Sequence, residues 1–164
     1  MPLSGIRVID LGRHLAGPTA AMWLGDLGAD VIKIENPGKG EDARSSGPPF
    51  FNGESAFFLA ANRNKRSLAL DLKRPEGQAI FRKLAATADV VVENFRPGVM
   101  EALEIGYETV AETNPGIIYC SISGFGKDGP YASRPGLDQI IQGVSGLMSI
   151  TGFEGGEPTR VGIP

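Results

Sequence analysis

The fold class follows from one stretch of the chain, Ala88-Asp89-Val90-Val91-Val92-Glu93-Asn94-Phe95-Arg96-Pro97-Gly98. Its three consecutive valines are typical of a strand that is buried on both faces, which is the usual situation in a parallel sheet. A short polar segment follows the valines, and Pro97 and Gly98 predict a turn there. The stretch therefore predicts a parallel strand that ends in a polar loop.

This polar loop is a candidate binding site, because ligands of open α/β sheets bind just outside the carboxyl ends of the strands. Asn94 offers an amide, Phe95 a flat apolar face and Arg96 a guanidinium group. Such a set of side chains suits a nucleotide-like ligand that carries phosphate groups.

Strands and helices are expected to alternate along the rest of the chain. Apolar runs predict strands at residues 6–11, 31–35, 67–72, 90–92 and 117–123. Apolar periodicity and start signals predict helices at residues 18–27, 55–61, 75–85, 99–103, 107–113 and 137–149, and the Gly/Pro-rich residues 36–56 predict a long loop. The alternation predicts an α/β fold, a Rossmann-like parallel sheet with helices on both faces.

The composition is that of one ordinary globular domain. The 164 residues suffice for a single core, and a net charge of −3 with scattered basic residues argues against nucleic acid as a partner. No apolar run reaches membrane-spanning length and residues 1–5 do not resemble a signal peptide, so a cytoplasmic protein without a membrane partner is expected. The single cysteine, Cys120, lies in an apolar run and is expected to be a core residue rather than a reactive thiol.

The first predicted loop, residues 12–18, lies where a dinucleotide fingerprint would lie, but its glycines are too far apart for G-x-G-x-x-G. Two interpretations stay open: a plain strand–helix turn, or backbone N–H groups and a helix dipole that hold an anion or an acyl group. His14 is the chain's one histidine, and a lone loop histidine is more often solvated than catalytic.

Three cations occupy four positions at Arg63, Lys65 and Arg66, just before the strand predicted at 67–72. They are interpreted either as a solvated charge run or as phosphate ligands. Lys73, at the far end of that strand, favours phosphate binding, and strand direction predicts that it converges with Asn94 and Arg96 at one edge of the sheet.

No residue stands out as a catalytic nucleophile. Asp138 opens the last predicted helix, where a carboxylate that answers the helix dipole is the simpler interpretation. The sequence contains no Ser/His/Asp set, no metal-ligand cluster and no P-loop, so no metal is expected.

Several segments together resemble the N-terminal part of the class III (CaiB/BaiF-type) coenzyme A transferases, the family of formyl-CoA transferase, carnitine CoA-transferase and α-methylacyl-CoA racemase. The resemblance covers the whole chain in order. Its segments are Pro2–Asp10, Ala16-Gly17-Pro18, Leu27–Glu35, Asn64–Ser67, Leu70–Lys73, Glu93–Gly98 and Ser123–Gly126.

The resemblance implies an incomplete CoA-binding Rossmann-like domain over residues 1–164, with CoA as substrate and carrier and no tightly bound cofactor. Positions that match the family's CoA contacts are Leu15, Ala16, Leu70, Asp71, Leu72, Lys73, Asn94, Phe95 and Arg96, and His14, Leu137 and Asp138 are candidates on the substrate side. Several relatives carry Arg where this chain has Asn36, and Arg44 or Lys39 is expected to compensate.

The resemblance also implies an activity for the complete protein: transfer of CoA between an acyl-CoA and a carboxylic acid through an aspartyl-CoA thioester. By register, the family's catalytic aspartate falls a few residues past the stretch Arg160–Pro164, so this chain alone is expected to be inactive. The resemblance further implies a homodimer of interlocked subunits. Racemases carry His-Asp where this chain has Leu137-Asp138, and leucine cannot move a proton, which favours a transferase. A CoA- or nucleotide-binding module without chemistry of its own remains an alternative.

Overall fold

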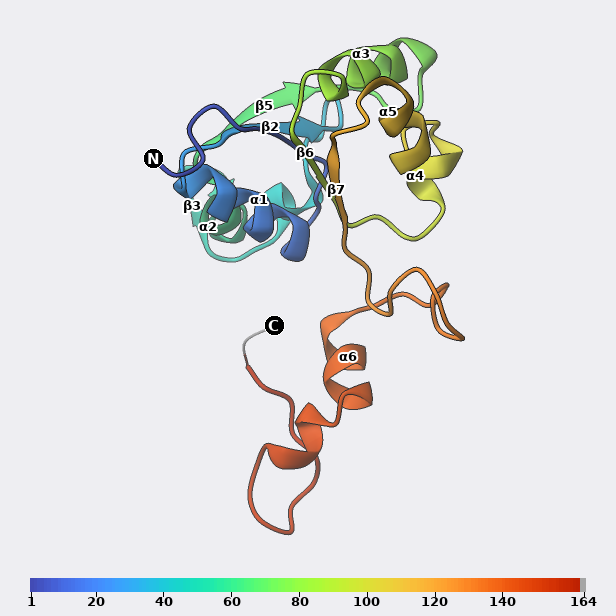
Figure 1. Cartoon of the computed structure of the whole chain (residues 1–164). Helices are drawn as coiled ribbons and strands as arrows, with labels where there is room; N and C mark the ends of the chain where they lie inside the picture. The colour runs from blue at the N-terminus through green and yellow to red at the C-terminus, as the bar shows by residue number, and fades with distance from the viewer. Residues whose placement is uncertain (163–164) are drawn as a thin grey trace. The chain divides into compact units, whose positions relative to one another are not determined.

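The computed structural model describes residues 1–162, which form two compact units, Met1–Ile122 and the residues from Ser123 onward. The first unit is built around a sheet of five parallel strands in the order β5-β2-β1-β6-β7 (Figure 1). These strands are β1 (Arg7–Asp10), β2 (Asp30–Glu35), β5 (Lys65–Ala69), β6 (Val90–Glu93) and β7 (Ile118–Ser121). The predicted α/β fold with a parallel sheet is confirmed.

The strand order reverses between β1 and β6. The chain runs outward from β1 through β2 to β5, then returns to the other side of β1 to form β6 and β7. Val91 of β6 pairs with Ile9 of β1 on one side and with Tyr119 of β7 on the other. In an open α/β sheet, such a reversal leaves a crevice at the carboxyl ends of the two strands, where ligands bind.

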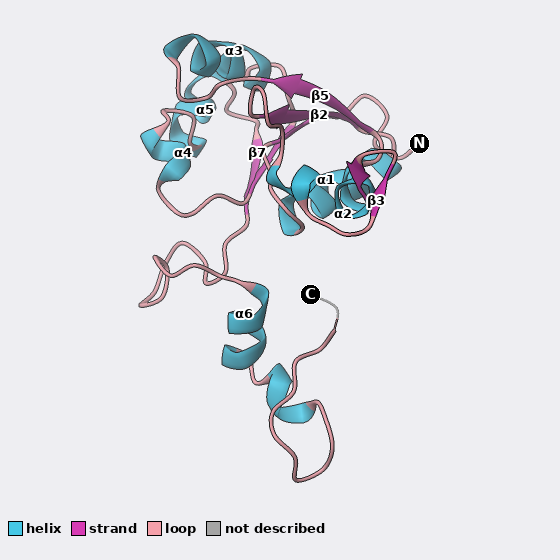
Figure 2. Cartoon of the chain, turned by 180° about the vertical axis from the view of Figure 1, so that it is seen from behind, coloured by secondary structure: helices cyan, strands magenta, loops and turns pink. Residues whose placement is uncertain are grey.

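Helices cover both faces of the sheet (Figure 2). One face packs against α1 (Ala16–Asp26), on which α2 (Ala56–Asn62) lies, and the other packs against α3 (Pro75–Ala85), α4 (Val99–Ala102) and α5 (Tyr107–Thr113). Successive strand residues enter opposite cores: Val92 packs in the cluster of Ala21, and Val91 in the cluster of Phe81. This explains why the valines follow one another without a polar residue between them.

Two predicted segments differ from the structure. The third strand of the chain's sheet was expected at residues 67–72, but β5 begins two residues earlier and ends at Ala69, so Leu70–Lys73 lie in the loop that follows. The long loop predicted at 36–56 contains a 3-10 turn, η1 (Asp42–Ser45), and a small antiparallel hairpin of β3 (Phe50–Phe51) and β4 (Glu54–Ser55). In α3, Phe81 is fully buried, whereas its neighbour Ile80 is 45% exposed.

The described part of the second unit contains one α-helix and one 3-10 turn. The helix predicted at 137–149 is shorter: α6 (Asp138–Val144) ends before Gly146, whose φ of +81° stops the helix, and η2 (Leu147–Ile150) follows. Gln142 is buried and binds both backbone polar groups of Val161, with its Oε1 2.8 Å from the Val161 N–H. One carboxamide thus links α6 to the segment that follows η2.

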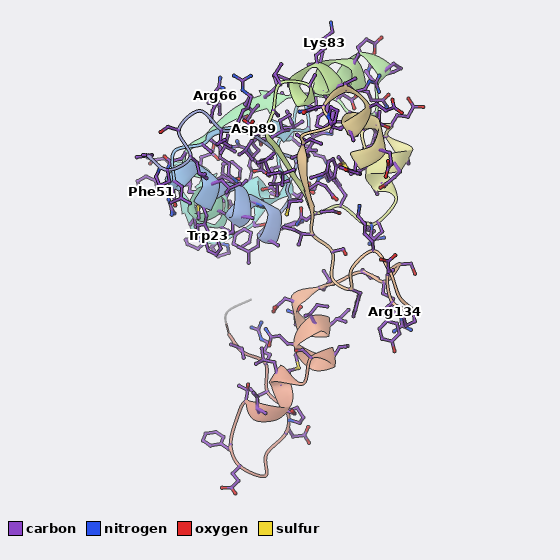
Figure 3. All side chains as sticks on the ribbon, in the orientation of Figure 1. Trp23, Phe51, Arg66, Lys83, Asp89 and Arg134 are labelled. Atoms are coloured by element: carbon purple, nitrogen blue, oxygen red, sulfur yellow. The ribbon has the colours of Figure 1, made fainter. Side chains whose placement is uncertain are left out.

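No described helix is both long and apolar enough to cross a membrane. Trp23 on α1 projects outward with 61% of its surface exposed, and Lys83 lies on the outer side of α3 (Figure 3). Cys120 is only partly buried, and it packs against the core that contains Val31 and Val92.

Candidate ligand-binding site

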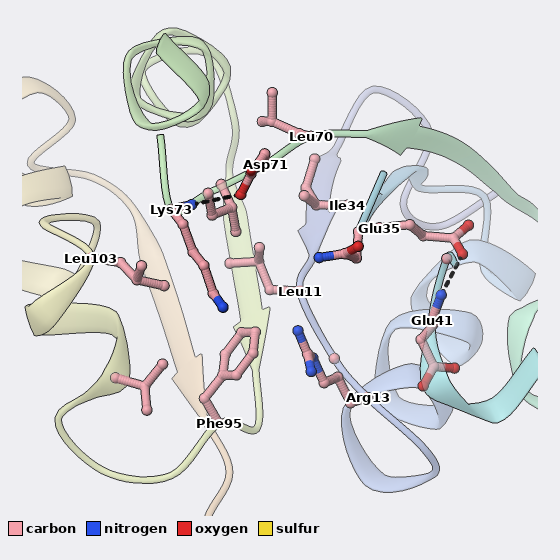
Figure 4. Close-up of a pocket in the computed structure, with 15 residues that line it drawn as sticks. Leu11, Arg13, Ile34, Glu35, Glu41, Leu70, Asp71, Lys73, Phe95 and Leu103 are labelled. Atoms are coloured by element: carbon pink, nitrogen blue, oxygen red, sulfur yellow. Dashed lines mark hydrogen bonds between the residues drawn. The ribbon is translucent and has the colours of Figure 1, made fainter. Parts of the chain in front are cut away.

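A cavity of about 260 Å³ lies at the carboxyl ends of four strands (Figure 4). The segments after β1, β2, β5 and β6 each contribute residues to its wall. The lining residues are Leu11, Gly12, Arg13, Ile34, Glu35, Asn36, Gly40, Glu41, Leu70, Asp71, Leu72, Lys73, Phe95, Val99 and Leu103. The cavity therefore occupies the edge of the sheet at which the strand order predicts a ligand.

Five of the residues that the sequence suggested line this cavity together: Leu70, Asp71, Leu72, Lys73 and Phe95. Leu70 belongs to the buried core, and Phe95 packs against it. The Lys73 side chain extends from its loop towards the cavity in Figure 4, and it takes part in no ion pair with the residues that the structure describes. The cavity thus combines apolar walls with a lysine side chain that forms no ion pair with the described residues.

The other suggested residues lie elsewhere. Leu15 and Ala16 are at the start of α1, His14 is exposed in the loop before it, and Arg96 is exposed beyond β6. None of these four lines the cavity.

Two further candidates, Leu137 and Asp138, belong to the second unit. Leu137 precedes α6 and is 63% exposed. The Asp138 carboxylate accepts a hydrogen bond of 2.9 Å from the Gln142 amide. The stretch Arg160–Pro164, on which the expected position of the catalytic aspartate rests, lies partly outside the described residues.

Asn94 uses its whole carboxamide to hold the loop after β1. Its Oδ1 accepts a hydrogen bond of 2.7 Å from the Arg13 N–H, and its Nδ2 donates one of 2.9 Å to the Arg13 carbonyl. Gly17 leaves room for this arrangement, since a Cβ there would lie 3.1 Å from Asn94 Oδ1 and 2.8 Å from the Gly12 Cα. Asn94 therefore joins the loops that follow β1 and β6.

Buried charges bind the rest of the same loop. The Gly12 N–H donates to Asp10 Oδ1 at 2.7 Å, and Lys33 Nζ donates to the Gly12 carbonyl at 2.8 Å. The His14 N–H donates to Glu41 Oε1 at 2.9 Å, which helps to hold His14 at a φ of +58°. Asp10, Lys33 and Glu41 are each at least 95% buried. Side chains thus bind five consecutive backbone polar groups, from the Gly12 N–H to the His14 N–H.

The three cations at residues 63–66 form hydrogen bonds and ion pairs within the first unit. These contacts do not support the interpretation of the cluster as a phosphate site. Lys65 is buried and donates to Asp10, Asn62 and the Pro18 carbonyl at 2.7–2.8 Å. Burial lowers the pKa of Lys65, and the Asp10 carboxylate offsets this only in part. Arg63 and Arg66 pair with Asp26 and Asp30, respectively.

Arg44 does not supply the cation that Asn36 lacks. Its guanidinium binds Glu35 at 2.7 and 2.8 Å and lies 3.8 Å from the Phe58 ring centroid. Burial alone would raise the pKa of Glu35, but hydrogen bonds from Arg44, Ser67 and the Glu41 N–H outweigh it and lower that pKa to about 2. Lys39 remains largely exposed, 4.0 Å from Asp42.

Sequence reasoning missed Arg13. It lines the cavity, and its guanidinium lies 4.8 Å from the centroid of the Phe95 ring and 3.3 Å from Asp42 Oδ2. The sequence did offer one signal for Arg13: it lies in the loop after the strand predicted at residues 6–11, and loops at this end of a parallel sheet carry binding residues. No group of three or more potential metal ligands occurs among the described residues.

The strand order defines a Rossmann-like domain with a cavity at the carboxyl ends of its strands. The chain matches CoA-transferase family III over residues 3–164 and belongs to that family, as the resemblance indicated. A solved CAIB/BAIF family protein from Brucella suis shares the fold with a TM-score of 0.95 and 48% identity, over 99% of this chain and 44% of that one.

Two curated relatives add functional context. Succinyl-CoA:glutarate CoA-transferase from Homo sapiens is 53% identical over 99% of this chain and 37% of its own length. Acetyl-CoA:oxalate CoA-transferase from Acetobacter aceti is 50% identical over 98% of this chain and 41% of its own length. The chain therefore spans about two fifths of the length of these relatives.

Proposed function

We propose that residues 1–164 form the CoA-binding N-terminal portion of an acyl-CoA:carboxylate CoA-transferase. The single observation that carries the proposal is the cavity at the carboxyl ends of β1, β2, β5 and β6, with apolar walls and with Lys73 directed towards it. Family membership supports the same proposal from the side of the sequence.

The size and chemistry of the cavity suit one end of CoA. Its volume of about 260 Å³ is below the roughly 300–1,000 Å³ of pockets that enclose a drug-sized ligand, so it would take the nucleotide end rather than the whole molecule. Leu70, Leu72 and Phe95 offer apolar contact for a base, and Lys73 offers charge for a phosphate. The pantetheine arm would then leave along the edge of the sheet.

In the proposed reaction, an aspartate of the complete protein, C-terminal to Pro164, acts as the nucleophile. Its carboxylate attacks the acyl-CoA carbonyl and expels CoA thiolate, which leaves a mixed anhydride. The thiolate then attacks the aspartyl carbonyl, which releases the donor acid and forms the aspartyl-CoA thioester. The acceptor carboxylate repeats the two steps in reverse order and leaves with CoA.

The acceptor acid stays open, because relatives named for glutarate and for oxalate are almost equally similar to this chain. The proposal also includes a homodimer of the complete protein and a cytoplasmic location. A racemase is the less favoured reading, since Leu137 cannot transfer a proton. Racemase activity would be detected as deuterium exchange at the α-carbon of a 2-methylacyl-CoA.

Isothermal titration calorimetry of the chain with CoA tests the binding role. We expect saturable binding, with the affinity lowered about tenfold or more by Lys73→Ala, because a charge-assisted hydrogen bond contributes about 1.5–3 kcal/mol. The matched control is Lys83→Ala, on the outer side of α3, which should leave the affinity unchanged. Absence of CoA binding by the unsubstituted chain would contradict the proposal.

The expected lack of chemistry is tested separately. The chain is incubated with succinyl-CoA and glutarate, and the acyl-CoA products are separated by chromatography. Appreciable transfer would place the nucleophile within residues 1–164 and would contradict that part of the proposal.

A further inference from the structure

Arg13 is the one arginine among the described residues that line the cavity. Its guanidinium group lines the cavity and lies against the Phe95 ring, 4.8 Å from the ring centroid (Figure 4). Its carboxylate partner is Asp42, at 3.3 Å, and the side chains of this pair are 46% and 37% exposed. An ion pair so open to water contributes little, so a ligand phosphate can replace Asp42 at small cost.

Arg44 shows the opposite arrangement. Two of its nitrogens bind the buried Glu35 carboxylate and a third binds Glu54, while the Phe58 ring covers its guanidinium plane. A bidentate pair with a buried carboxylate is not exchanged cheaply, because release would leave the Glu35 charge without its partner. Of these two arginines, only Arg13 is free to change partners.

The backbone of Arg13 is fixed although its side chain is exposed. The Asn94 carboxamide binds both its N–H and its carbonyl, at 2.7 and 2.9 Å. The neighbouring peptide groups are bound by the buried side chains of Asp10, Lys33 and Glu41. A guanidinium that starts from a rigid backbone and rests on an aromatic ring loses less freedom when it binds a ligand.

We infer that Arg13 is a phosphate-binding residue of this cavity and that Asn94 is the positioning residue that aims it. That the site binds phosphate is inferred from the position and exposure of the Arg13 guanidinium. That the phosphate belongs to CoA rests on the proposed function. Arg13 and Lys73 then supply the two cations of the site, and Asn94 acts through Arg13 rather than by contact with the ligand.

Calorimetry with CoA and with dephospho-CoA tests the role of Arg13. Arg13→Gln should lower the affinity for CoA at least tenfold, while Arg66→Gln, which removes another exposed arginine paired with an aspartate, should change it less than twofold. A loss seen with CoA alone assigns Arg13 to the 3′-phosphate, and an equal loss with both ligands assigns it to the diphosphate. Unchanged affinity of Arg13→Gln for both ligands would overturn the inference.

A double-mutant cycle tests the role of Asn94. Asn94→Ala should weaken CoA binding about as much as Arg13→Gln, and the double variant should be no weaker than either single variant, because both remove the same contact. Asn94→Asp keeps the acceptor and loses the donor, and serves if the alanine variant does not fold. Fully additive losses would show that Asn94 contacts the ligand itself and would overturn its positioning role.

Nuclear magnetic resonance separates this inference from the proposed function. The Arg13 Nε–H resonance should show a ring-current shift that Phe95→Leu abolishes, and inorganic pyrophosphate should move it in the unsubstituted chain. If CoA does not bind but pyrophosphate still moves this resonance, the proposed function fails and the phosphate site stands. If neither ligand moves it, the inference fails as well.

Discussion

Lys65 Nζ lies 2.8 Å from Asp10 Oδ2, although 55 positions separate the two residues in the chain. Both side chains are at least 98% buried, and Lys33 Nζ lies 3.5 Å from the same Asp10 oxygen. Because Asp10 also accepts the Gly12 N–H, the pair supports the loop that leads to the cavity. Buried charge at the core of this sheet is therefore part of how the site is built.

Substitution of Lys65 should be costly. Lys65→Met should lower the free energy of unfolding by about 3–5 kcal/mol, because it leaves the buried Asp10 carboxylate short of a partner. The measurement is urea unfolding followed by circular dichroism. Arg66→Met is the matched control: it removes the next cation, which pairs with Asp30 at the surface, and should cost no more than about 1 kcal/mol. Equal losses for the two variants would contradict the distinction between the pairs.

The pKa of Glu35 predicts loss of stability in acid. Since its pKa is about 2 in the folded chain and about 4.3 in an unfolded one, the folded state favours the charged form. The resulting stabilisation, about 2–3 kcal/mol, is fully present above pH 4.5 and is lost as the pH falls towards 2. Urea unfolding at a series of pH values should show this loss, and Glu35→Gln should remove it.

A matched carboxylate controls for general acid effects. Glu112→Gln, on the exposed side of α5, should leave the pH dependence between 4.5 and 2 unchanged. A Glu35→Gln variant that loses stability in acid as steeply as the unsubstituted chain would contradict the role given to Glu35.

Gly77 fixes how closely α3 approaches the loop that carries Lys73. A Cβ on Gly77 would lie 2.0 Å from the Asp71 carbonyl oxygen. Because this distance is a steric clash, the backbone would have to shift to accommodate any side chain at this position. Gly77→Ala should therefore lower the free energy of unfolding by about 1–3 kcal/mol and weaken CoA binding, because it shifts the Asp71–Lys73 segment. Thermal unfolding and calorimetry measure the two effects.

Gly143 in α6 provides the contrasting case. A Cβ there would meet only Met148 Sδ, at 4.0 Å, so Gly143→Ala fits without a clash. Alanine should stabilise the helix by about 0.5–1 kcal/mol, because it restricts the unfolded chain more than glycine does. Destabilisation by Gly143→Ala would show that the helix packs more tightly than described.

Hydrogen exchange should be slow in the exposed loop after β1. The Arg13 and His14 N–H groups are bound by Asn94 and by the buried Glu41 carboxylate, so they should exchange far more slowly than the amide of exposed Gly38. In Asn94→Ala, protection of the Arg13 amide should fall while that of β1 remains. Fast exchange at Arg13 in the unsubstituted chain would contradict a rigid loop.

The sheet could be predicted from the sequence because its signal is local. Consecutive apolar residues such as Val91 and Val92 must be buried on both faces, and this leaves few folds for a chain with alternating helices. Strand direction alone predicted that Lys73 would converge with Asn94 and Arg96 at one edge of the sheet. Lys73 lines the cavity at the carboxyl ends of the strands, but Asn94 and Arg96 do not.

The roles of the charged residues could not be predicted in the same way. Arg63, Lys65 and Arg66 resemble a phosphate site by spacing, but their partners Asp26, Asp10 and Asp30 are 36–55 positions away. The same holds for Asn94, whose partner Arg13 is 81 positions away. Which charge is neutralised and which is free depends on tertiary contacts that no local pattern records.

The loop Gly12–His14 owes its shape to side chains that lie outside it. Asp10, Lys33, Glu41 and Asn94 come from four separate parts of the chain, and together they bind the backbone polar groups from the Gly12 N–H to the His14 N–H. Grafting residues 12–14 alone onto another Rossmann-like protein would transfer their sequence but not their backbone conformation. A graft that preserves the conformation has to include Asp10, Lys33, Glu41 and Asn94 as well.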